Sequence, residues 1–437
     1  MNRKRSSTLS VHKVHEYYVG SQIAHGSFSS IRSGCHMSNK IQRAIKMISK
    51  KKVENTESGN KILFSEHYIA PVLSYEYVIE VHECIESQGQ LFLVMDYLTS
   101  DLYSYIQENK LSYLEKIRIV DEIMAAVEYL HSRHICSRDI KLENVMLDDK
   151  MHVKVIDFGF SEICLSPIQG VFGSVGCAAP EIFNLLEYDG KKADIWSLGV
   201  LIYELFSGTK PISDKRLKDG VYIVDYSHID SPIVDIIRLM LHINPDMRTP
   251  ISSLRKHEVF NCIKIRANVL VPNFLSPIIY PTSQALFLTS IAFNQPESTI
   301  RECLISSTIN KEKIYYTLIK EKYGDNIESC LINVNSECSS LPCPGCDFFC
   351  SDAPKGTKFP IHQLPYQALG IIKSSLLERG YCISYNNDGF FHAVFNTPTD
   401  DIQVIFRIDT HDNNHELTLL LDNSDSHQIV SEIFTKL

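Results

Sequence analysis

The pattern of hydrophobic and polar residues divides the first 260 positions into two parts of different character. Between positions 17 and 97, short runs with strand character dominate, and one helical segment at about 61–73 interrupts them. The predicted strands span 17–23, 30–35, 42–48, 77–83 and 91–97. Between 101 and 260 the apolar positions recur mostly with a helical period, most clearly at 114–131 and 194–207. This order predicts an α+β protein with a β-rich lobe followed by an α-helical lobe.

The rest of the chain has further segments of distinct pattern. Residues 262–283 hold three prolines and little periodicity, which is typical of a linker. Helical patterning returns at 284–324, and a segment rich in Cys, Ser and Pro follows to about 357. The last part alternates a helix at 366–379 with strands around 382–386, 390–395, 402–408 and 416–421, and it closes on a helix at 428–437. The polar and basic residues 1–16 predict a flexible leader.

Composition narrows the class of protein. At 437 residues the chain is too long for one hydrophobic core, and 44% hydrophobic with 22% charged residues is close to the globular average. The net charge of −9 argues against a nucleic-acid partner, because phosphate backbones require a basic face. We find no apolar run of the roughly 18–20 residues that cross a bilayer, so we expect no stable membrane association. Thirteen scattered cysteines favour reduced thiols and a cytoplasmic location over a disulfide framework.

Seven short motifs carry the residues with chemical function, and they occur in one order along the chain. They are Ile23-Ala24-His25-Gly26-Ser27-Phe28-Ser29-Ser30-Ile31, Ala44-Ile45-Lys46, Ser137-Arg138-Asp139-Ile140-Lys141-Leu142-Glu143-Asn144, Asp157-Phe158-Gly159, Ala179-Pro180-Glu181, Asp194-Ile195-Trp196-Ser197-Leu198-Gly199, and Arg248. In this order and spacing they resemble the protein-kinase catalytic domain over residues 17 to about 260. The resemblance implies a two-lobed kinase fold, and an enzyme that transfers the γ-phosphoryl group of ATP to protein substrates.

The chemistry of phosphoryl transfer explains why these residue types are needed. The transition state carries its charge on phosphate oxygens, so the protein mainly positions groups and supplies positive charge. The resemblance implies that Asp139 accepts the proton of the substrate hydroxyl and that Lys141, typical of serine/threonine kinases, neutralises the transferring group. Asn144 and Asp157 are expected to hold Mg²⁺, with Mn²⁺ as an alternative, through hard oxygen ligands. Ser174 stands where such kinases carry a threonine that supports the first two residues.

The nucleotide is expected to lie between the two lobes. Lys46 would hold the α- and β-phosphates, oriented by Glu66, and the adenine would lie in an apolar slot with Met95 as its gatekeeper. The backbone of 96–98 would read the adenine edge. The residues expected to bind ATP are Ile23, Ala24, His25, Gly26, Ser27, Phe28, Ser29, Ser30, Ile31, Ala44, Lys46, Glu66, Met95, Asp96, Leu98, Asp101 and Met146. Glu181 with Arg248 resembles the buried ion pair of the family, and Asp194 is expected to pin the catalytic loop.

The sequence departs from the family at the phosphate loop and in the column that joins the lobes. Ala24 and Ser29 replace two of three glycines, which restricts the backbone and predicts weaker ATP affinity. Ser137 and Ala70 are small where the family has larger residues, so the active arrangement is expected to be less favoured unless a partner or the C-terminal region fills in.

The activation segment departs as well. Gly170 stands at the position of the usual activating threonine, so Arg138 lacks its usual phosphate partner, and Ser161 and Ser166 are the nearby candidates. The rival interpretation is a pseudokinase scaffold. Because all five polar catalytic groups are retained, the active enzyme is favoured.

The regions after residue 262 show two further resemblances. The run 314–319 within 284–324 is similar to the small three-helix, ubiquitin-associated-type domain of AMP-activated and microtubule-affinity-regulating kinases. The end of the chain resembles the kinase-associated C-terminal domain of the same branch. Its acidic residues outnumber its basic ones, which favours regulation by intramolecular restraint, or protein binding, over lipid contact.

One cysteine cluster could hold a metal. Cys338, Cys343, Cys346 and Cys350 form C-x4-C-x2-C-x3-C, and four thiolates could surround Zn²⁺, but a single C-x2-C without a second pair favours a loop with free thiols. The expected organisation of the chain is a leader at 1–16, a catalytic domain at 17–262, a linker at 263–283, a ubiquitin-associated-like domain at 284–324, a Cys/Ser/Pro-rich loop at 325–357 and a C-terminal α+β domain at 358–437.

Overall fold

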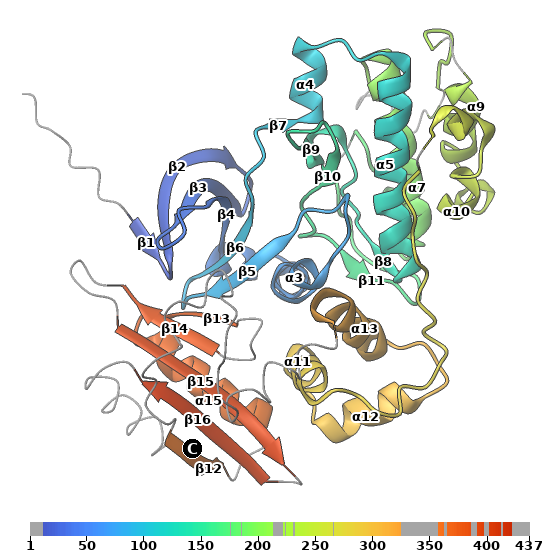
Figure 1. Cartoon of the computed structure of the whole chain (residues 1–437). Coiled ribbons are helices and arrows are strands. Elements are labelled where there is room, and N and C mark those ends of the chain that lie inside the picture. The colour runs from blue at the N-terminus through green and yellow to red at the C-terminus, as the bar shows by residue number, and fades with distance from the viewer. Residues whose placement is uncertain are drawn as a thin grey trace, which may run out of the picture.

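The computed structural model describes residues 12–174, 176–184, 186–212, 222, 224–229, 232–264, 266–324, 357–361, 365–385, 391–396, 402–411 and 414–421. Within these ranges the chain forms a strand-rich lobe, a helical lobe, three further helices and a C-terminal sheet with one helix, as Figure 1 shows. The predicted α+β class and the order of the two lobes are confirmed. The Cys338–Cys350 cluster and the expected helix at 428–437 lie outside the described residues.

The strand-rich lobe is an antiparallel sheet with the order β1-β2-β3-β4-β6-β5. Its strands are β1 (His12–Val14), β2 (Tyr17–His25), β3 (Ser29–His36), β4 (Gln42–Ser49), β5 (Val81–Glu86) and β6 (Gln90–Asp96). The leader predicted at 1–16 was wrong at its C-terminal end, because residues 12–14 form a strand that pairs with β2. The strand expected at 77–83 begins at Val81.

The helical segment of this lobe is not a uniform α-helix. It runs through α2 (Gly59–Phe64), the π-helical turn η1 (Ser65–Ile69) and α3 (Ala70–Val72), after the short α1 (Lys50–Glu54). A π-helical turn inside a helix is frequent at functional sites because it re-aims side chains. Here it carries Glu66, which is buried.

The helical lobe is built around two long buried helices, α5 (Tyr113–Ser132) and α7 (Gly190–Ser207). Ser112 and Glu115 form a complete capping box that starts α5, and Gly208, with φ 77°, ends α7 in the left-handed conformation. The other elements here are β7 (Ser100–Asp101), α4 (Leu102–Glu108), β8 (Ile135–Cys136), η2 (Leu142–Asn144), β9 (Val145–Leu147), β10 (Val153–Val155), β11 (Glu162–Ile163), α6 (Pro180–Asn184), α9 (Ile233–Met240), η3 (Pro245–Met247), α10 (Ile251–Leu254) and η4 (Glu258–Cys262).

The three helices that follow are α11 (Ser283–Phe293), α12 (Glu297–Ile305) and α13 (Lys311–Tyr323). Most of their buried apolar residues belong to the same hydrophobic core as the helical lobe and the α2–α3 segment, whereas Phe287 of α11 belongs to the core of the C-terminal sheet. Two aromatic contacts show this continuity: the Phe64 ring lies 5.8 Å from Phe293, and Tyr68 lies 6.5 Å from Tyr315. The three-helix unit therefore packs directly against the segment that carries Glu66.

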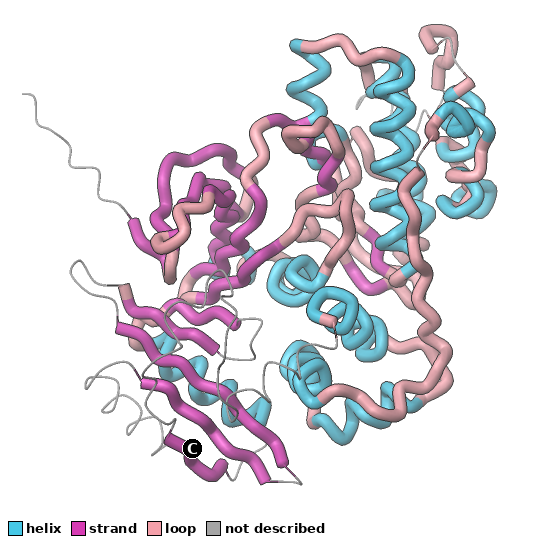
Figure 2. The backbone as a smooth tube through the Cα atoms, in the orientation of Figure 1, coloured by secondary structure: helices cyan, strands magenta, loops and turns pink. Residues whose placement is uncertain are grey.

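The C-terminal strands join the sheet of the first lobe. β12 (Thr357–Ile361), α15 (Pro365–Glu378), β13 (Cys382–Tyr385), β14 (Phe391–Phe395), β15 (Ile402–His411) and β16 (Asn414–Leu421) form this region. β13 pairs antiparallel with β5, with Ile383 opposite Glu86 and Ser384 opposite Ile85. Among the described residues, eleven strands thus form one sheet. Figure 2 shows these strands in magenta, both in the first lobe and in the C-terminal region. The sequence pattern did not predict this continuity.

The cysteines correct a second prediction. Cys136 and Cys164 form a disulfide, whereas six others among the described residues are free. The expectation of reduced thiols throughout was therefore wrong for this pair, because the pairing of β8 with β11 brings two positions 28 residues apart to a Cα–Cα distance of 6.4 Å. Among the described residues, none of the helices has the length and apolar character that a bilayer crossing requires.

Candidate active site

The cleft side of the strand-rich lobe holds a three-residue ionic cluster. Lys46, on β4, donates from Nζ to Glu66 Oε1 at 2.5 Å and to Asp157 Oδ1 at 2.8 Å. The three residues come from a strand, a π-helical turn and the loop after β10, so their convergence depends on the tertiary fold. The expected orientation of Lys46 by Glu66 is therefore present as a direct contact.

The charges of this cluster fix its protonation. Burial alone would lower the pKa of Lys46, but the carboxylates of Asp157 and Glu66 raise it above its ordinary value. Burial would raise the pKa of Asp157, and the neighbouring Lys46 ammonium lowers it instead. Burial raises the pKa of Glu66. At neutral pH the cluster therefore keeps a charged lysine and a charged Asp157.

The second group of polar side chains lies on the loop between β8 and β9. Lys141 Nζ donates to Asp139 Oδ2 at 2.7 Å and to Ser174 Oγ at 2.8 Å, and the Ser174 hydroxyl donates to Asp139 Oδ1 at 3.2 Å. Asn144 donates from Nδ2 to the backbone oxygen of Asp139 at 2.9 Å and to Oδ2 at 2.8 Å. Asp139 is thus held by three neighbours, all of which the sequence had singled out.

The backbone of this loop is fixed from below by α7. Asp194, which is fully buried, accepts from the amide nitrogens of Ser137 and Arg138, both at 2.8 Å, as expected. His131 Nε2 lies 2.9 Å from the same carboxylate. Arg138 has a φ of 65°, a conformation that costs energy in a non-glycine residue and persists where surrounding contacts hold it. Asp157, at 64°, is another such position.

The residues expected around ATP lie on the two lobes as the motif order suggested. Ile23, Ala24 and His25 end β2 and are exposed, and Gly26 closes the turn to β3 by donating from its amide to Ser29 O at 2.8 Å. Ser27 and Phe28 complete that turn, and Ser30 and Ile31 lie opposite His25 and Ala24 on β3. Ala44 is buried on β4 opposite Met95 of β6, and Leu98 is half-buried.

Three of the expected nucleotide contacts have other partners as well. The Asp96 carboxylate lies 3.1 Å from Arg43 Nη1 and 2.7 Å from His82 Nε2. Asp101 caps α4 by accepting from the Ser104 amide at 2.8 Å. Met146 pairs with Asp101 between β9 and β7, at the floor of the cleft. Side-chain capping by Asp101 is compatible with a ribose contact through its second oxygen only.

Comparison with known proteins agrees with this geometry. A family model for the protein kinase domain matches residues 17–260, more than half of the chain. The chain belongs to the protein kinase family. Because the match covers both lobes, the two polar groups described above lie within the matched kinase domain.

Individual relatives place this kinase near one branch. It is 34% identical over 256 residues to the SNF1-related protein kinase catalytic subunit alpha KIN12 of Arabidopsis thaliana, covering 56% of this chain and 51% of that protein. It is 30% identical over 270 residues to the carbon catabolite-derepressing protein kinase of Candida glabrata, covering 60% and 44%. A probable serine/threonine-protein kinase of Dictyostelium discoideum is 27% identical over 338 residues, covering 72% and 40%. The resemblance to the AMP-activated type of kinase is confirmed, and the aligned part of this kinase spans about half the length of these relatives.

The kinase places a carboxylate beside the arginine of its catalytic loop, which the sequence analysis missed. Glu162 Oε2, on β11, lies 3.1 Å from Arg138 Nη1 and 3.5 Å from Lys61 Nζ on α2. Arg138 also donates to the Phe160 carbonyl at 2.5 Å and lies over the Phe172 ring at 4.1 Å. The only sequence signal was an acid five residues after Asp157, and its orientation depends on the pairing of β11 with β8.

The column that joins the two lobes of the kinase is buried in spite of its small members. Ala70, Ser137, Val81 and Phe158 are all 3% exposed or less. The Phe158 carbonyl accepts from the Ser65 hydroxyl at 2.5 Å, a second link from η1 to the loop after Asp157. Ser137 also lines a cavity of about 10 Å³ between α5 and the catalytic loop. Polar bonding thus complements apolar packing in this column.

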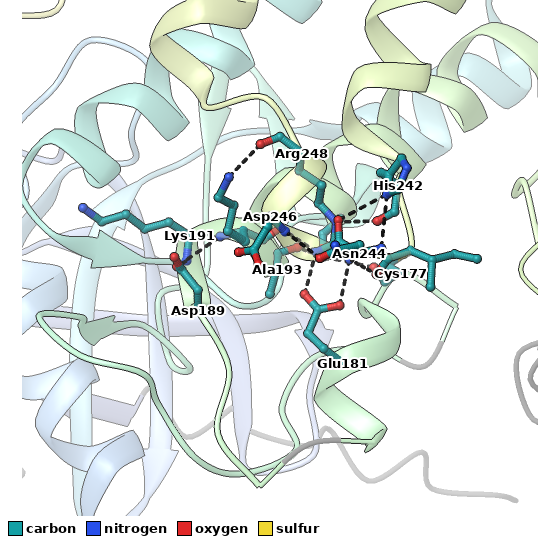
Figure 3. A network of polar contacts seen from close by, with 12 residues as sticks. Cys177, Glu181, Asp189, Lys191, Ala193, His242, Asn244, Asp246 and Arg248 are labelled. Atoms are coloured by element: carbon teal, nitrogen blue, oxygen red, sulfur yellow. Dashed lines mark hydrogen bonds and ion pairs between the residues drawn. The ribbon is translucent and has the colours of Figure 1, made fainter.

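A buried ion pair fixes the end of the activation segment, as Figure 3 shows. Arg248 donates to both oxygens of Glu181, at 2.5 and 2.7 Å, and to the backbone oxygens of His242 and Lys192. The guanidinium also lies 5.1 Å from the Trp196 ring. With a further bond to the Ile243 carbonyl, every donor of the guanidinium is occupied, so the bidentate pair is rigid and holds α6 against the helical lobe.

Proposed function

We propose that this protein is a serine/threonine kinase that transfers the γ-phosphoryl group of Mg·ATP to hydroxyl groups of protein substrates. The observation that carries the proposal is the geometry of two neighbouring polar groups: Lys46 with Glu66 and Asp157, and Asp139 with Lys141, whose charge lies close enough to lower the pKa of Asp157. A scaffold without turnover has no need to keep Lys46 bonded to Glu66 and Asp157, and Asp139 bonded to Lys141.

The roles follow from the contacts. Asp139 is the proposed base, because its carboxylate is oriented by Lys141 and Ser174 and can accept the proton of an attacking hydroxyl. Lys141 keeps a positive charge beside the site of transfer, where negative charge spreads over the phosphoryl oxygens. The lysine side chain in this loop supports serine or threonine as the acceptor.

Nucleotide binding is assigned to the facing surfaces of the lobes. Lys46, charged and held by Glu66, is the proposed contact for the α- and β-phosphates. The apolar residues Ile31, Ala44 and Met146 are the proposed walls for the adenine. The exposed phosphate loop, with Ala24 and Ser29 in place of glycine, is expected to bind ATP more weakly than a glycine-rich loop does.

The metal assignment rests on the chemistry of the donors. Asp157 offers a carboxylate whose pKa is lowered by Lys46 against the effect of burial, and Asn144 uses its amide nitrogen on Asp139, which leaves its oxygen for a ligand. Hard oxygen donors of this kind fit Mg²⁺ or Mn²⁺. When bound, the ion would neutralise phosphate charge; the residues named here would hold it.

The C-terminal region is proposed to regulate the catalytic domain from within the chain. We assign 284–324 to a ubiquitin-associated-like unit and the region from 358 to a kinase-associated-type domain. In support, Phe293 and Tyr315 contact the segment that carries Glu66, and Lys373 Nζ on α15 lies 2.6 Å from Glu86 on β5. The Lys46–Glu66 contact is present while the three-helix unit and the C-terminal domain are docked on the catalytic domain. We therefore propose that docking supports the active arrangement, in which Glu66 orients Lys46.

Two finer points stay predictions. Glu143, next to Asn144, is exposed and is proposed to favour a basic residue before the target hydroxyl. A peptide-array profile without Arg or Lys preference would contradict this role. A cytoplasmic location is supported by the free cysteines in the part of the chain that the structure describes, while the Cys136–Cys164 disulfide argues in the other direction.

The proposed function is tested by phosphoryl transfer from γ-labelled ATP to a peptide library with central Ser, Thr or Tyr, with Mg²⁺ present. We expect label on Ser and Thr peptides, and a loss of at least about 100-fold in Asp139→Asn and Asp157→Ala. Asp149→Asn, an exposed acid on the same lobe, is the control and should match wild type. Equal label in wild type and Asp157→Ala would mean a contaminating enzyme, and no label in wild type would support the pseudokinase scaffold.

A further inference from the structure

Three metal-ligating side chains meet where the N-terminal hairpin touches the C-terminal sheet. His15 and Glu16 form the turn between β1 and β2, and His392 lies on β14. One ligand atom from each of the three lies within 4.8 Å of the others. The imidazole rings of His15 and His392 are 4.5 Å apart and nearly perpendicular. The cluster thus joins two ends of the chain that are 377 residues apart.

The turn that presents His15 is held by the C-terminal region. His15 has a φ of 52°, a left-handed conformation that costs about 1–2 kcal/mol in a non-glycine residue. Asn396 stabilises it with two bonds: its Oδ1 accepts from the His15 amide at 2.9 Å, and its Nδ2 donates to the His15 carbonyl at 3.0 Å. The two hydrogen bonds from Asn396 therefore fix the backbone of His15 and, with it, the direction of the imidazole toward the cluster.

The two nitrogens of the His15 ring have different surroundings. Nε2 lies 3.3 Å from the His392 carbonyl and 3.2 Å from the Ser384 hydroxyl. A carbonyl only accepts, so this contact places the ring proton on Nε2 and leaves a lone pair on Nδ1. Among the described residues Nδ1 has no hydrogen-bond partner, although it is buried, and Glu83 Oε1 lies 3.3 Å from it.

The Nδ1 side of the His15 ring favours a cation, either a proton shared with Glu83 or a metal ion. A lone pair on Nδ1 and a carboxylate oxygen repel each other, and a buried ring that is only 1% exposed cannot turn to water. A metal ion beside Nδ1 would accept the lone pair and face the carboxylate of Glu16, with the negative charge of Glu83 nearby. His36 Nε2, 3.6 Å from Glu16 Oε2, adds a further imidazole at the rim.

The second imidazole has the outer contact that metal-binding histidines commonly have. Gln403 Oε1 accepts from His392 Nε2 at 3.2 Å, which leaves the lone pair of that ring on its other nitrogen. We propose that His15, Glu16 and His392 bind a divalent transition metal of the Zn²⁺ class at this junction. Two imidazoles with one carboxylate suit Zn²⁺ better than Mg²⁺ or Ca²⁺, which prefer oxygen ligands.

Metal binding would tighten the junction. Ligands of a tetrahedral Zn²⁺, about 2.0–2.1 Å from the ion, lie roughly 3.3 Å from each other. The ligand atoms, which lie within 4.8 Å of one another, would therefore approach each other by at most about 1.5 Å. The ion would hold the β1–β2 turn on β14 and so fasten the C-terminal sheet to the strand-rich lobe. The inference does not depend on the kinase activity, because metal content is measured without turnover.

The test measures zinc affinity by competition with a chromogenic chelator, on the full-length chain that carries Cys338→Ser, Cys343→Ser, Cys346→Ser and Cys350→Ser. These changes remove the four clustered thiols as competing zinc ligands. We expect about one zinc per chain, retained in the exposed control His228→Ala, and at least tenfold weaker binding in His15→Ala and His392→Ala, because even outer contacts of metal ligands contribute tenfold or more.

Glu16→Gln keeps the turn and its size, so it serves where a histidine variant fails to fold, and it should weaken binding at least tenfold as well. Retained near-ultraviolet circular dichroism identifies the folded variants. No zinc in the parent chain, or equal affinity in the parent and all folded variants, would overturn the proposal.

Discussion

At the residue scale, Glu162 takes a position beside Arg138 that a phosphate group is expected to occupy in related kinases. Its carboxylate contacts Arg138 of the catalytic loop and Lys61 of α2, so one side chain links both lobes. Gly170 stands where those kinases carry the activating threonine. We interpret this carboxylate as a permanent substitute for the link that phosphorylation provides in kinases with the activating threonine.

This interpretation predicts the effect of Glu162→Gln. The change keeps the size of the side chain but removes its charge, and a charge-assisted bond of this kind contributes about 1.5–3 kcal/mol. We expect kcat/KM for peptide phosphorylation to fall by about 10- to 100-fold, measured by initial rates. Glu57→Gln, at an exposed position, should match wild type, and phosphatase treatment of wild type should change the rate less than twofold. A strong loss after phosphatase treatment would contradict the prediction.

His67, on the π-helical turn η1, gives a prediction about pH. Burial, reinforced by the positive charges of Lys373 and Lys50 and opposed by Glu86, lowers the pKa of His67 from 6.5 to about 4. The unfolded chain therefore binds a proton between pH 6.5 and 4 that the folded chain does not. Stability from this group is fully present above pH 6.5 and is lost as the pH falls through that interval.

The measurable difference lies between wild type and His67→Gln. Lowering the pH from 7.5 to 5 should reduce the free energy of unfolding of wild type by about 1–2 kcal/mol more than that of the variant, as measured by urea denaturation. His228→Gln changes an exposed histidine and should follow wild type. Equal losses of stability in wild type and His67→Gln would mean that the buried imidazole does not determine how the free energy of unfolding depends on pH.

At the element scale, the sequence predicted most of the helices and strands, and the differences have physical causes. Periodicity located the long helices, because their apolar faces are continuous, and it located β2 to β4 within two residues. It missed β1, because three residues with two polar side chains gain a strand conformation only by pairing with β2. It also missed the π-helical turn, because Ser65 and Glu66 take that conformation through contacts with Phe158 and Lys46.

The pairing of β8 with β11 gives a prediction about the disulfide. Cys136 and Cys164 close a loop of 28 residues across this pair, which in the chain-entropy model stabilises the fold by about 3–4 kcal/mol. Dithiothreitol should therefore lower the thermal midpoint of wild type by several degrees. The thermal midpoint of Cys164→Ser should already be low without dithiothreitol, and the reagent should not change it. Cys262→Ser, at an exposed free cysteine, should respond as wild type does. Equal midpoints of wild type with and without reductant would refute the link.

At the scale of the whole molecule, the catalytic cleft was predictable and the assembly of the chain was not. The motifs specify Lys46, Asp139 and Asp157 by their order and spacing. The fold bonds Lys46 to Asp157 and places Lys141, the partner of Asp139, close enough for its charge to lower the pKa of Asp157. The joining of β13 to β5 has no comparable signal, because an edge strand accepts any partner of suitable geometry, and Ile383 and Ile85 would be buried in many alternative pairings. The same holds for the junction of His15 with His392.

The contact of α11 with the Glu66-bearing segment predicts how the C-terminal region acts on catalysis. Phe293 lies 5.8 Å from the rings of both Phe64 and Tyr315, so it transmits packing from the three helices to α2 and η1. Truncating a packed aromatic side chain costs about 3 kcal/mol where the site cannot collapse. Phe293→Ala should therefore loosen the Lys46–Glu66 contact, lower kcat/KM by about tenfold and raise the KM for ATP.

The control for this prediction is Phe206→Ala, which removes a half-buried ring at the end of α7, in contact with Tyr113 and remote from Glu66. It should reduce the thermal midpoint without raising the KM for ATP. Phe293→Leu, which restores apolar volume, should recover most of the activity. The docked C-terminal region and the Lys46–Glu66 contact coexist in one structure. An increase in activity on Phe293→Ala would therefore contradict the prediction. It would mean that the C-terminal region restrains the kinase and that turnover is not limited by how well this region supports η1.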